Sequence, residues 1–281
     1  MAKKMPTRKR SPKEYLVFID TNILLDFYRA RGREGGLSIL EHFEGNHERI
    51  ITTAQVEMEY KKNRQRVIVD CLNQEIKDPK GEGVGVPSFL LGSQPDEGYK
   101  KAKETMAAQV KRLRERTARL LKSPSENDPV YQPLQRLFKA GCAVHLMREQ
   151  KERFEIRRLA RKRFCLGYPP RKDKDTSIGD AINWEWVVRC SAVTKKHIVI
   201  VSRDGDYGVT YRNESYLNDW LRQEFKERTT SHRDIILTQR LTDAFKKADI
   251  KVTAKEEEEE AQLVGSLAAD RESGEDLDGE D

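Results

Sequence analysis

Residues 15–28, YLVFIDTNILLDFY, constrain the fold more than any other stretch of this sequence. Residues 15–19 form a continuous run of apolar, β-branched and aromatic side chains, which is typical of a strand buried on both faces of a parallel sheet. The run ends in Asp20, and the short polar residues Thr21 and Asn22 then suit the start of a helix. Because ligands bind at the carboxyl ends of strands in open α/β sheets, Asp20 is a candidate site residue.

The charge of the chain is distributed unevenly. The 281 residues carry a net charge of +6, but residues 256–281 contain twelve acids and a single arginine, a net charge of −11. Residues 1–255 therefore carry +17. A body this basic is expected to attract polyanions, nucleic acid first among them, unless the charges only form a solvated surface.

Cysteine, histidine and hydropathy patterns exclude several classes of protein. The four cysteines are far apart with no CxxC pair, and the histidines show neither HExxH nor zinc-finger spacing, so we expect reduced thiols and no zinc site. The basic start followed by an apolar run resembles a secretory leader, but Asp20 and Asp26 interrupt the apolar part. No stretch reaches transmembrane length, so the sequence predicts a soluble cytoplasmic protein without a membrane partner.

Strands alternate with helices along most of the chain. Apolar runs at residues 49–52, 197–201, 235–237 and 250–252 read as further strands, which predicts an α/β fold with a central, mostly parallel sheet. We divide the chain into a basic flexible arm at 1–13, a main domain at 14–255 with a basic helical insertion at about 79–170, and an acidic disordered tail at 256–281.

The insertion begins with a loop rich in proline and glycine at 79–98. Residues 99–122 then show apolar side chains in a four-three rhythm, which is typical of a helix in a hairpin or coiled coil. A second helix is predicted over 134–164, with Phe154 buried and the basic side chains outside. The candidate nucleic-acid-binding residues on it are Arg157, Arg158, Arg161, Lys162 and Arg163. Such a charged face is either a solvated surface, a substrate-binding arm or a contact with a second protomer.

Acidic residues recur where strands end. Asp20 and Asp204 each follow a buried strand, and Asp180 opens the helix before the strand that carries Asp204. A glutamate near the start of the helix after the second strand, Glu57 or Glu59, would complete a cluster. Carboxylates about 4 Å apart repel by roughly 4 kcal/mol per pair at an effective dielectric of 20, so the cluster needs a cation or protons. Carboxylate oxygens suit Mg²⁺ or Mn²⁺, which favours metal-assisted phosphodiester hydrolysis.

The acidic motifs together resemble those of PIN-domain nucleases. The matching stretches are FIDTN at 18–22, a glutamate after TTAQV, GDA at 179–181 and VSRDGDY at 201–207. The likeness covers most of residues 14–255 and is greatest to the PIN-like branch with a long helical insertion. It implies a PIN-like three-layer α/β sandwich and a metal-dependent nuclease that uses Mg²⁺ or Mn²⁺ and most often acts on RNA.

The resemblance assigns roles residue by residue. Asp20 matches the first metal ligand, Asp180 the third acid and Asp204 the fourth, while the spacing favours Glu59 over Glu57 as the second. Supporting positions that orient ligands or a water are Asn22 and Ser202, and Asn183 lies one helical turn beyond Asp180. Asp206 is either an additional metal ligand or an acid of a tight turn. Trp184 and Trp186 are expected to pack rather than to stack on bases.

Several alternatives to an RNA-cleaving endonuclease remain. Related acid-cluster folds also cut DNA or flap structures, and a PIN scaffold can bind nucleic acid without cutting it. A phosphatase of the haloacid-dehalogenase kind ranks last, because it needs an aspartate where this chain has Asn22. PIN-like proteins often pair, so a homodimer is one partner option and an inhibitor protein is another. The acidic tail either competes with nucleic acid for the basic body or only aids solubility.

Overall fold

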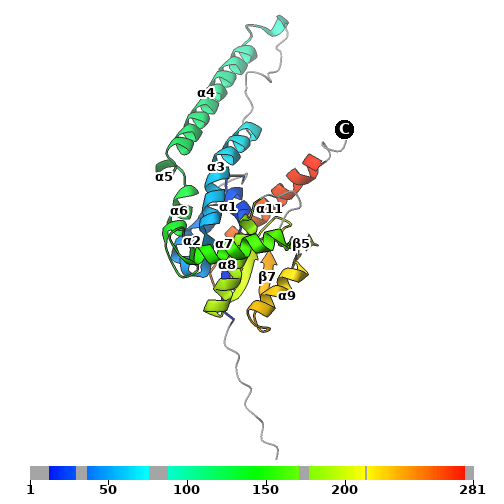
Figure 1. The fold of residues 1–281 in the computed structure, drawn as a ribbon. Helices are drawn as coiled ribbons and strands as arrows, with labels where there is room; N and C mark the ends of the chain where they lie inside the picture. The colour runs from blue at the N-terminus through cyan, green and yellow to red at the C-terminus, as the bar shows by residue number, and fades with distance from the viewer. Residues whose placement is uncertain (1–12, 30–36, 76–87, 171–176, 213, 276–281) are drawn as a thin grey trace, which may run out of the picture.

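The computed structural model describes residues 13–29, 37–75, 88–170, 177–212 and 214–275. Nearly all of the predicted basic arm at 1–13, the loop at 79–87 and the last residues of the tail lie outside these ranges. The described chain forms a body with one long helix standing away from it (Figure 1).

A five-stranded parallel sheet forms the centre of the body, in the order β3-β2-β1-β4-β7. Its strands are β1 (Tyr15–Ile19), β2 (Ile50–Thr53), β3 (His145–Leu146), β4 (His197–Val201) and β7 (Ile235–Thr238). In the central pair, Tyr15 lies opposite His197 and Ile19 opposite Val201. Both runs are buried, as expected for strands covered on two faces.

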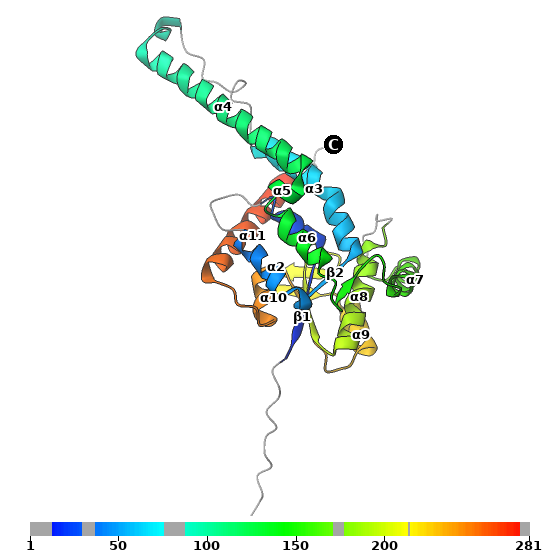
Figure 2. The same cartoon turned by 90° about the vertical axis from the view of Figure 1, so that its left-hand side faces the viewer.

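Helices cover both faces of the sheet, which confirms the predicted α/β fold (Figure 2). Helix α8 (Gly179–Thr194) packs on β2 and β4, with α7 (Glu152–Cys165) and α9 (Asp219–Arg228) outside it. Helix α10 (Leu241–Lys247) packs on β1, β4 and β7 from the opposite side. Smaller elements of this layer are η1 (Ser38–Leu40), α2 (Glu41–Gly45) and η2 (His47–Arg49).

Two short strands, β5 (Gly208–Tyr211) and β6 (Glu214–Leu217), form a separate antiparallel hairpin after β4. Gly208 is required there, because a Cβ would lie 2.0 Å from the Tyr216 carbonyl oxygen. The predicted strand at 250–252 is wrong, since these residues form no ladder with the described sheet.

The predicted insertion at about 79–170 is only partly a separate unit. Helix α4 (Gln94–Lys122), which η3 (Ser88–Leu90) precedes, projects from the body and meets it again through α5 (Pro124–Asn127) (Figures 1 and 2). Helix α6 (Tyr131–Lys139), β3 and α7 belong to the body, so the single helix predicted over 134–164 is wrong. Phe154 is 61% exposed rather than buried, because α7 packs through Ile156 and Ala160.

The base of α4 is fastened to α3 (Ala54–Glu75) by a buried arginine. Arg64 donates from Nη2 to the Leu120 carbonyl oxygen at 2.9 Å and from Nε to Asp128 at 2.8 Å. Tyr28 also donates to Asp128, at 2.6 Å, so one carboxylate joins three segments. The salt bridge is almost fully shielded from water.

The sequence predicts a disordered acidic tail, but helix α11 (Ala254–Glu275) occupies most of it. Charge density suggested a solvated coil, but two of its glutamates have defined partners. Glu260 caps α10 by accepting hydrogen bonds from the Thr242 backbone N–H at 2.8 Å and its hydroxyl at 2.6 Å. Glu256 bonds His42 at 3.0 Å and the backbone N–H of Thr253 at 2.8 Å.

Candidate active site

Asp20 lies at the carboxyl end of β1 and is the N-cap of α1 (Thr21–Asp26). Its Oδ1 accepts a hydrogen bond from the Thr21 backbone N–H at 2.7 Å. Its Oδ2 accepts from the Ser202 hydroxyl at 2.7 Å and from the Asn22 side-chain amide at 3.1 Å. Asp20 is 6% exposed, so the end of the strand and two neutral side chains fix its carboxylate in place.

Glu59 points toward Asp20 from the second turn of α3, whereas Glu57 does not. The Thr21 hydroxyl donates to Glu59 Oε2 at 3.1 Å, and the Gln55 amide donates to Oε1 at 2.7 Å. Glu57 instead accepts from Lys61 at 2.6 Å, one turn further along the same helix. The hydrogen bond from Thr21 therefore links Glu59 to the segment that carries Asp20.

Gly179, at the start of α8, leaves room for the Glu59 carboxylate. A Cβ at this position would lie 2.3 Å from Glu59 Oε1 and 2.9 Å from Gln55 Nε2. Asp180 is the next residue, so the absence of a side chain at 179 lets α3 and α8 bring their acids to the same place.

Asp204 follows β4 and is held near Asp20 through a serine. Its backbone N–H donates to the Ser202 hydroxyl at 3.2 Å, and the same hydroxyl donates to Asp20. Asn22 completes this group by donating to Ser202 Oγ at 3.3 Å. Asp20, Asn22, Ser202 and Asp204 are thus joined by hydrogen bonds across the central pair of strands.

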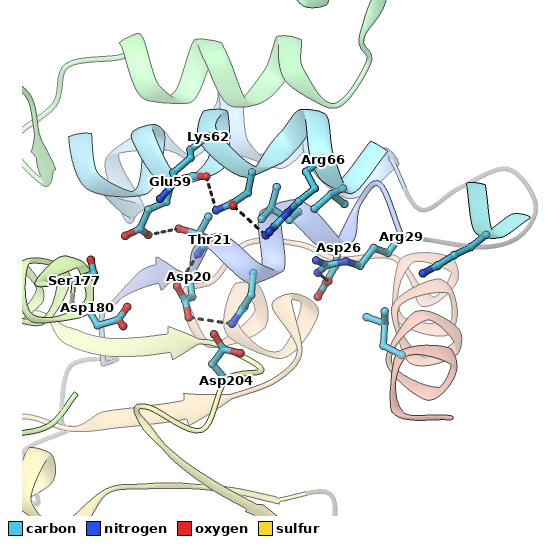
Figure 3. Close-up of a pocket in the computed structure, with 16 residues that line it drawn as sticks. Asp20, Thr21, Asp26, Arg29, Glu59, Lys62, Arg66, Ser177, Asp180 and Asp204 are labelled. Carbon is cyan, nitrogen blue, oxygen red and sulfur yellow. Dashed lines mark hydrogen bonds and ion pairs between the residues drawn. The ribbon is translucent and has the colours of Figure 1, made fainter. Parts of the chain in front are cut away.

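These acids line one pocket of about 700 Å³ at the carboxyl edge of the sheet (Figure 3). Asp20, Glu59, Asp180 and Asp204 all contribute to its wall. The pocket continues between α1 and α3 toward α11, and basic side chains contribute to its wall there. Its lining in that direction includes Asp26, Arg29, Lys62, Asn63, Arg66 and Leu267.

Burial and mutual charge disturb the titration of the groups around the acids. Burial, together with the neighbouring Asp204 and Glu59, raises the pKa of Asp20 from 3.8 to about 7, against the hydrogen bonds from Ser202 and Thr21. Burial also raises the pKa of Tyr207 well above its ordinary value, with contributions from Asp180, Asp20, Glu59 and Asp206. The negative potential therefore reaches a fully buried hydroxyl, which has no hydrogen-bond partner among the described residues.

Comparison with known proteins gives the family. The family model described as PIN domain matches residues 17–207, which is more than half of the chain. The chain belongs to the PIN domain family. No curated protein and no solved structure matches it. The helices within the described ranges are too short or too polar to cross a membrane.

PIN-domain nucleases generally use divalent metal ions, and the residues of this pocket suit such an ion. Among the described residues, no three His, Cys, Asp or Glu side chains are already grouped so that they could hold one metal ion. The donor set nevertheless fits a hard cation, because the cluster offers only carboxylate oxygens and Asp20 and Glu59 are partnered by neutral donors in the described chain. The space beside Gly179 keeps Glu59 within this set.

The other predicted residues of the PIN domain have mixed placements. Asn22 and Ser202 hold Asp20, but Asn183 is fully buried and accepts a hydrogen bond from the Thr53 hydroxyl at 2.7 Å, outside the pocket. Asp206 does not line the pocket either, although its charge affects Tyr207. Trp184 and Trp186 are buried, consistent with packing.

The prediction that Arg163 is an exposed nucleic-acid-binding residue is wrong. Its guanidinium is 4% exposed and donates to Glu185 at 2.9 Å, to Glu224 and to the Pro169 carbonyl oxygen at 2.5 Å. The run of basic residues gave no indication of this burial. One side of α7 faces α8, and Arg163 lies on that side. The other predicted residues, Arg157, Arg158, Arg161 and Lys162, are exposed on α7.

Sequence reasoning missed several residues of this PIN-domain site. Lys62 and Arg66 follow Glu59 at three and seven residues along α3, which places them on one helical face with it. That spacing was readable from the sequence. Gln55, Gly179 and Tyr207 lie within the matching motif stretches, but no role could be assigned to them there, since their roles depend on contacts between separate segments.

Proposed function

We propose that this protein is a metal-dependent endonuclease that hydrolyses RNA phosphodiester bonds, with Mg²⁺ or Mn²⁺ held by Asp20, Glu59, Asp180 and Asp204. The observation that carries the proposal is that four carboxylates from separate segments line one pocket of a PIN domain. A cluster of this kind supports chemistry rather than stability, because burial and the neighbouring Asp204 and Glu59 raise the pKa of Asp20.

The residues around the cluster have distinct roles in this proposal. Ser202 and Asn22 fix the orientation of the Asp20 carboxylate, and Gln55 and Thr21 fix that of Glu59. A divalent ion held there would supply Lewis-acid activation of water and would offset charge on the phosphate. Asp180 and Asp204 complete the set of oxygen donors for that ion.

The cationic wall of the pocket supports a polyanionic substrate. Lys62 and Arg66 are exposed on α3, in the same pocket as the acids. Arg29 also lines this pocket, just after α1, but pairs with Asp26 at 2.7 Å. The charges of Lys62 and Arg66 would attract the phosphates on one side of the scissile bond and so orient the strand. The preference for RNA over DNA is inherited from the resemblance to PIN nucleases.

A DNA or flap-structure nuclease is the second candidate, and the projecting helix α4 favours it. Nine lysines and arginines and four acids lie in this 29-residue helix, which could run along a duplex. A scaffold that binds nucleic acid without cutting it is the remaining alternative.

The test compares cleavage of end-labelled single-stranded RNA and DNA of matched sequence, with Mn²⁺ or with EDTA. Wild type is set against Asp20→Asn, and Glu155→Gln on the exposed face of α7 serves as the control. We expect cleavage by wild type and the control that needs metal, favours RNA and is lost in Asp20→Asn. Preference for DNA or for a flap substrate would support the second candidate. Tight binding by all three proteins without any cutting would support the scaffold.

A further inference from the structure

A second pocket of about 290 Å³ lies at the same carboxyl edge of the sheet, on the side of β3. It is built by the end of β3 and the residues after it, the start of α3, the first turns of α7 and the start of α8. Its lining consists of Ala54, Gln55, Met58, Leu146, Met147, Arg148, Arg153, Arg157 and Ile182.

Three arginines give this pocket a charge that the described part of the chain does not neutralise. Within the described residues, no carboxylate lies within ion-pair distance of Arg148, Arg153 or Arg157, so the three guanidinium groups face the pocket with their charges unpaired. Neighbouring arginines on α7 and α8 behave differently, since Arg163 pairs with Glu185 and Arg189 pairs with Glu155 at 2.8 Å.

Arg153 has a buried donor that no acceptor of the described chain uses. Its Nε is buried and has no hydrogen-bond partner in the described chain, although the guanidinium stacks on the Phe154 ring at 4.7 Å. A buried N–H of a charged group is costly unless it donates to an acceptor. Arg148 and Arg157 are exposed, so they would close over an anion from the rim.

We infer that this pocket binds a phosphate group of the nucleic-acid substrate, an inference that rests on the proposed nuclease function. Arginine is the side chain that recognises phosphate best, because its planar fork donates two parallel hydrogen bonds. Ala54 and Gln55 are the first residues of α3, so the positive end of a 22-residue helix also points to this place.

Gln55 connects the arginine pocket to the acid cluster. It lines the arginine pocket, and its amide donates to Glu59, which lines the acidic one. Ile182 of the same pocket lies two residues after Asp180. A phosphate held by the arginines would therefore lie on the β3 side of the acids, with Arg29, Lys62 and Arg66 on the other side. The strand would cross the sheet edge between two cationic regions.

The first experiment measures binding of a short single-stranded RNA in EDTA, with Asp20→Asn present in every protein so that cleavage cannot interfere. The pocket variant carries Arg148→Gln and Arg157→Gln, and the control carries Arg222→Gln and Lys226→Gln on the exposed face of α9. We expect the pocket variant to bind about tenfold more weakly and to lose about 1 from the slope of log K against log salt. The control should change little, and equal losses in the two variants would overturn the inference.

The second experiment identifies the source of the phosphate. The same RNA is compared as a 5′-phosphorylated strand, a 5′-hydroxyl strand and a covalently closed circle. If the arginines bind a terminal phosphate, removing it weakens binding to the Asp20→Asn protein and has no effect on the pocket variant. If they bind an internal phosphate, all three RNAs bind the Asp20→Asn protein alike and the pocket variant weakens each of them.

The two proposals can fail separately. If wild type cuts no nucleic acid but the arginine variant still loses RNA affinity, the phosphate-binding proposal is supported and the nuclease proposal is wrong. If wild type cuts RNA and the arginine variant binds as well as the control, the nuclease proposal is supported and the phosphate-binding proposal is wrong.

Discussion

Two groups of carboxylates lie close to the sheet in this protein, and their partners differ. Asp20, which is buried, and Glu59, which is half-buried, accept hydrogen bonds only from neutral donors of the described chain, namely hydroxyl, side-chain amide and backbone N–H groups. Glu185 is buried like Asp20, but Arg163 bonds one of its oxygens at 2.9 Å and Arg228 the other at 2.6 Å. No cationic side chain of the described chain neutralises Asp20 and Glu59, so they can bind a cationic ligand. The charge of Glu185 is neutralised by the two arginines.

The same contrast recurs around the acid pocket. Asp26 pairs with Arg29 at 2.7 Å and with Arg203 at 2.5 Å, and Arg203 also contacts Glu260 of α11. Asp26 lines the same pocket as Asp20, so burial and location alone do not separate a structural acid from a candidate metal ligand. The charge of the partner separates the two kinds of acid, because an arginine beside a carboxylate removes the negative potential that would attract a metal ion.

The largest expected effect is the loss of cleavage in Asp204→Asn. Removing one carboxylate from the cluster should lower the rate about a thousandfold, since the lost stabilisation of the transition state amounts to several kcal/mol. The free energy of unfolding should stay close to that of wild type or rise. Single-turnover cleavage and urea unfolding measure the two quantities, and a variant that cuts normally would remove Asp204 from the site.

Glu185→Gln should show the opposite behaviour. It leaves Arg163 and Arg228 to share the single counter-charge of Glu224, so the free energy of unfolding should fall by about 3 kcal/mol while the folded enzyme still cuts. Glu155→Gln removes an exposed pair with Arg189 and should cost less than about 1 kcal/mol. Urea unfolding of both variants tests this, and equal losses would contradict the distinction between buried and exposed pairs.

The stability of the metal-free protein should depend on the ionisation of Asp20. The pKa of Asp20 is raised from 3.8 to about 7 on folding, so the folded state holds this proton more tightly than the unfolded chain. The free energy of unfolding therefore falls as the pH rises from about 4 to about 7. A shift of about 3 pKa units corresponds to about 4 kcal/mol. Relative to wild type, Asp20→Asn should regain about half of this, about 2 kcal/mol, in EDTA at pH 8, because an amide has one acceptor oxygen where the carboxylate has two.

Melting curves in EDTA at pH 4 and pH 8 measure that difference. Added Mg²⁺ should then raise the melting temperature of wild type more than that of Asp20→Asn, because the variant lacks one of the four proposed carboxylate ligands. Equal metal responses in the two proteins would exclude Asp20 as a ligand.

The smallest expected effect concerns Gly179→Ala. The new methyl group would push the Glu59 carboxylate away, so cleavage should fall about tenfold, which corresponds to about 1.4 kcal/mol. Stability should change little, because alanine favours the helix that begins there. Gly98→Ala in α4 meets no atom within 4 Å and is the matched control, with unchanged activity.

The sequence predicted the parts of the fold and site that depend on local pattern. The apolar runs of β1 and β4 and the acids directly after them needed no tertiary information, and the motif spacing already favoured Glu59 over Glu57. The structure places Glu59 beside Thr21, while the role of the four acids as metal ligands stays a prediction.

Features that depend on distant partners could not be predicted in the same way. Strand β3 has only two residues, and its pairing with β2 rather than its own pattern defines it. Arg163 and Glu260 look like solvated charges in a charged run, but Glu185 and the start of α10 bury them. Burial of a charge is decided by its partner, and the partner lies far away along the chain.

The contact of Arg64 with the Leu120 carbonyl oxygen holds one end of α4 against α3, while the rest of the long helix projects into solvent (Figure 1). A helix of 29 residues is about 43 Å long, so a tilt of about 5° at its base would move its far end by about 4 Å. Arg64 lies at that base, only five residues after Glu59 on α3. The same tilt displaces a point so near the pivot by less than about 1 Å. A tilt that moves the far end of α4 by several ångström would therefore leave the acids close to their positions.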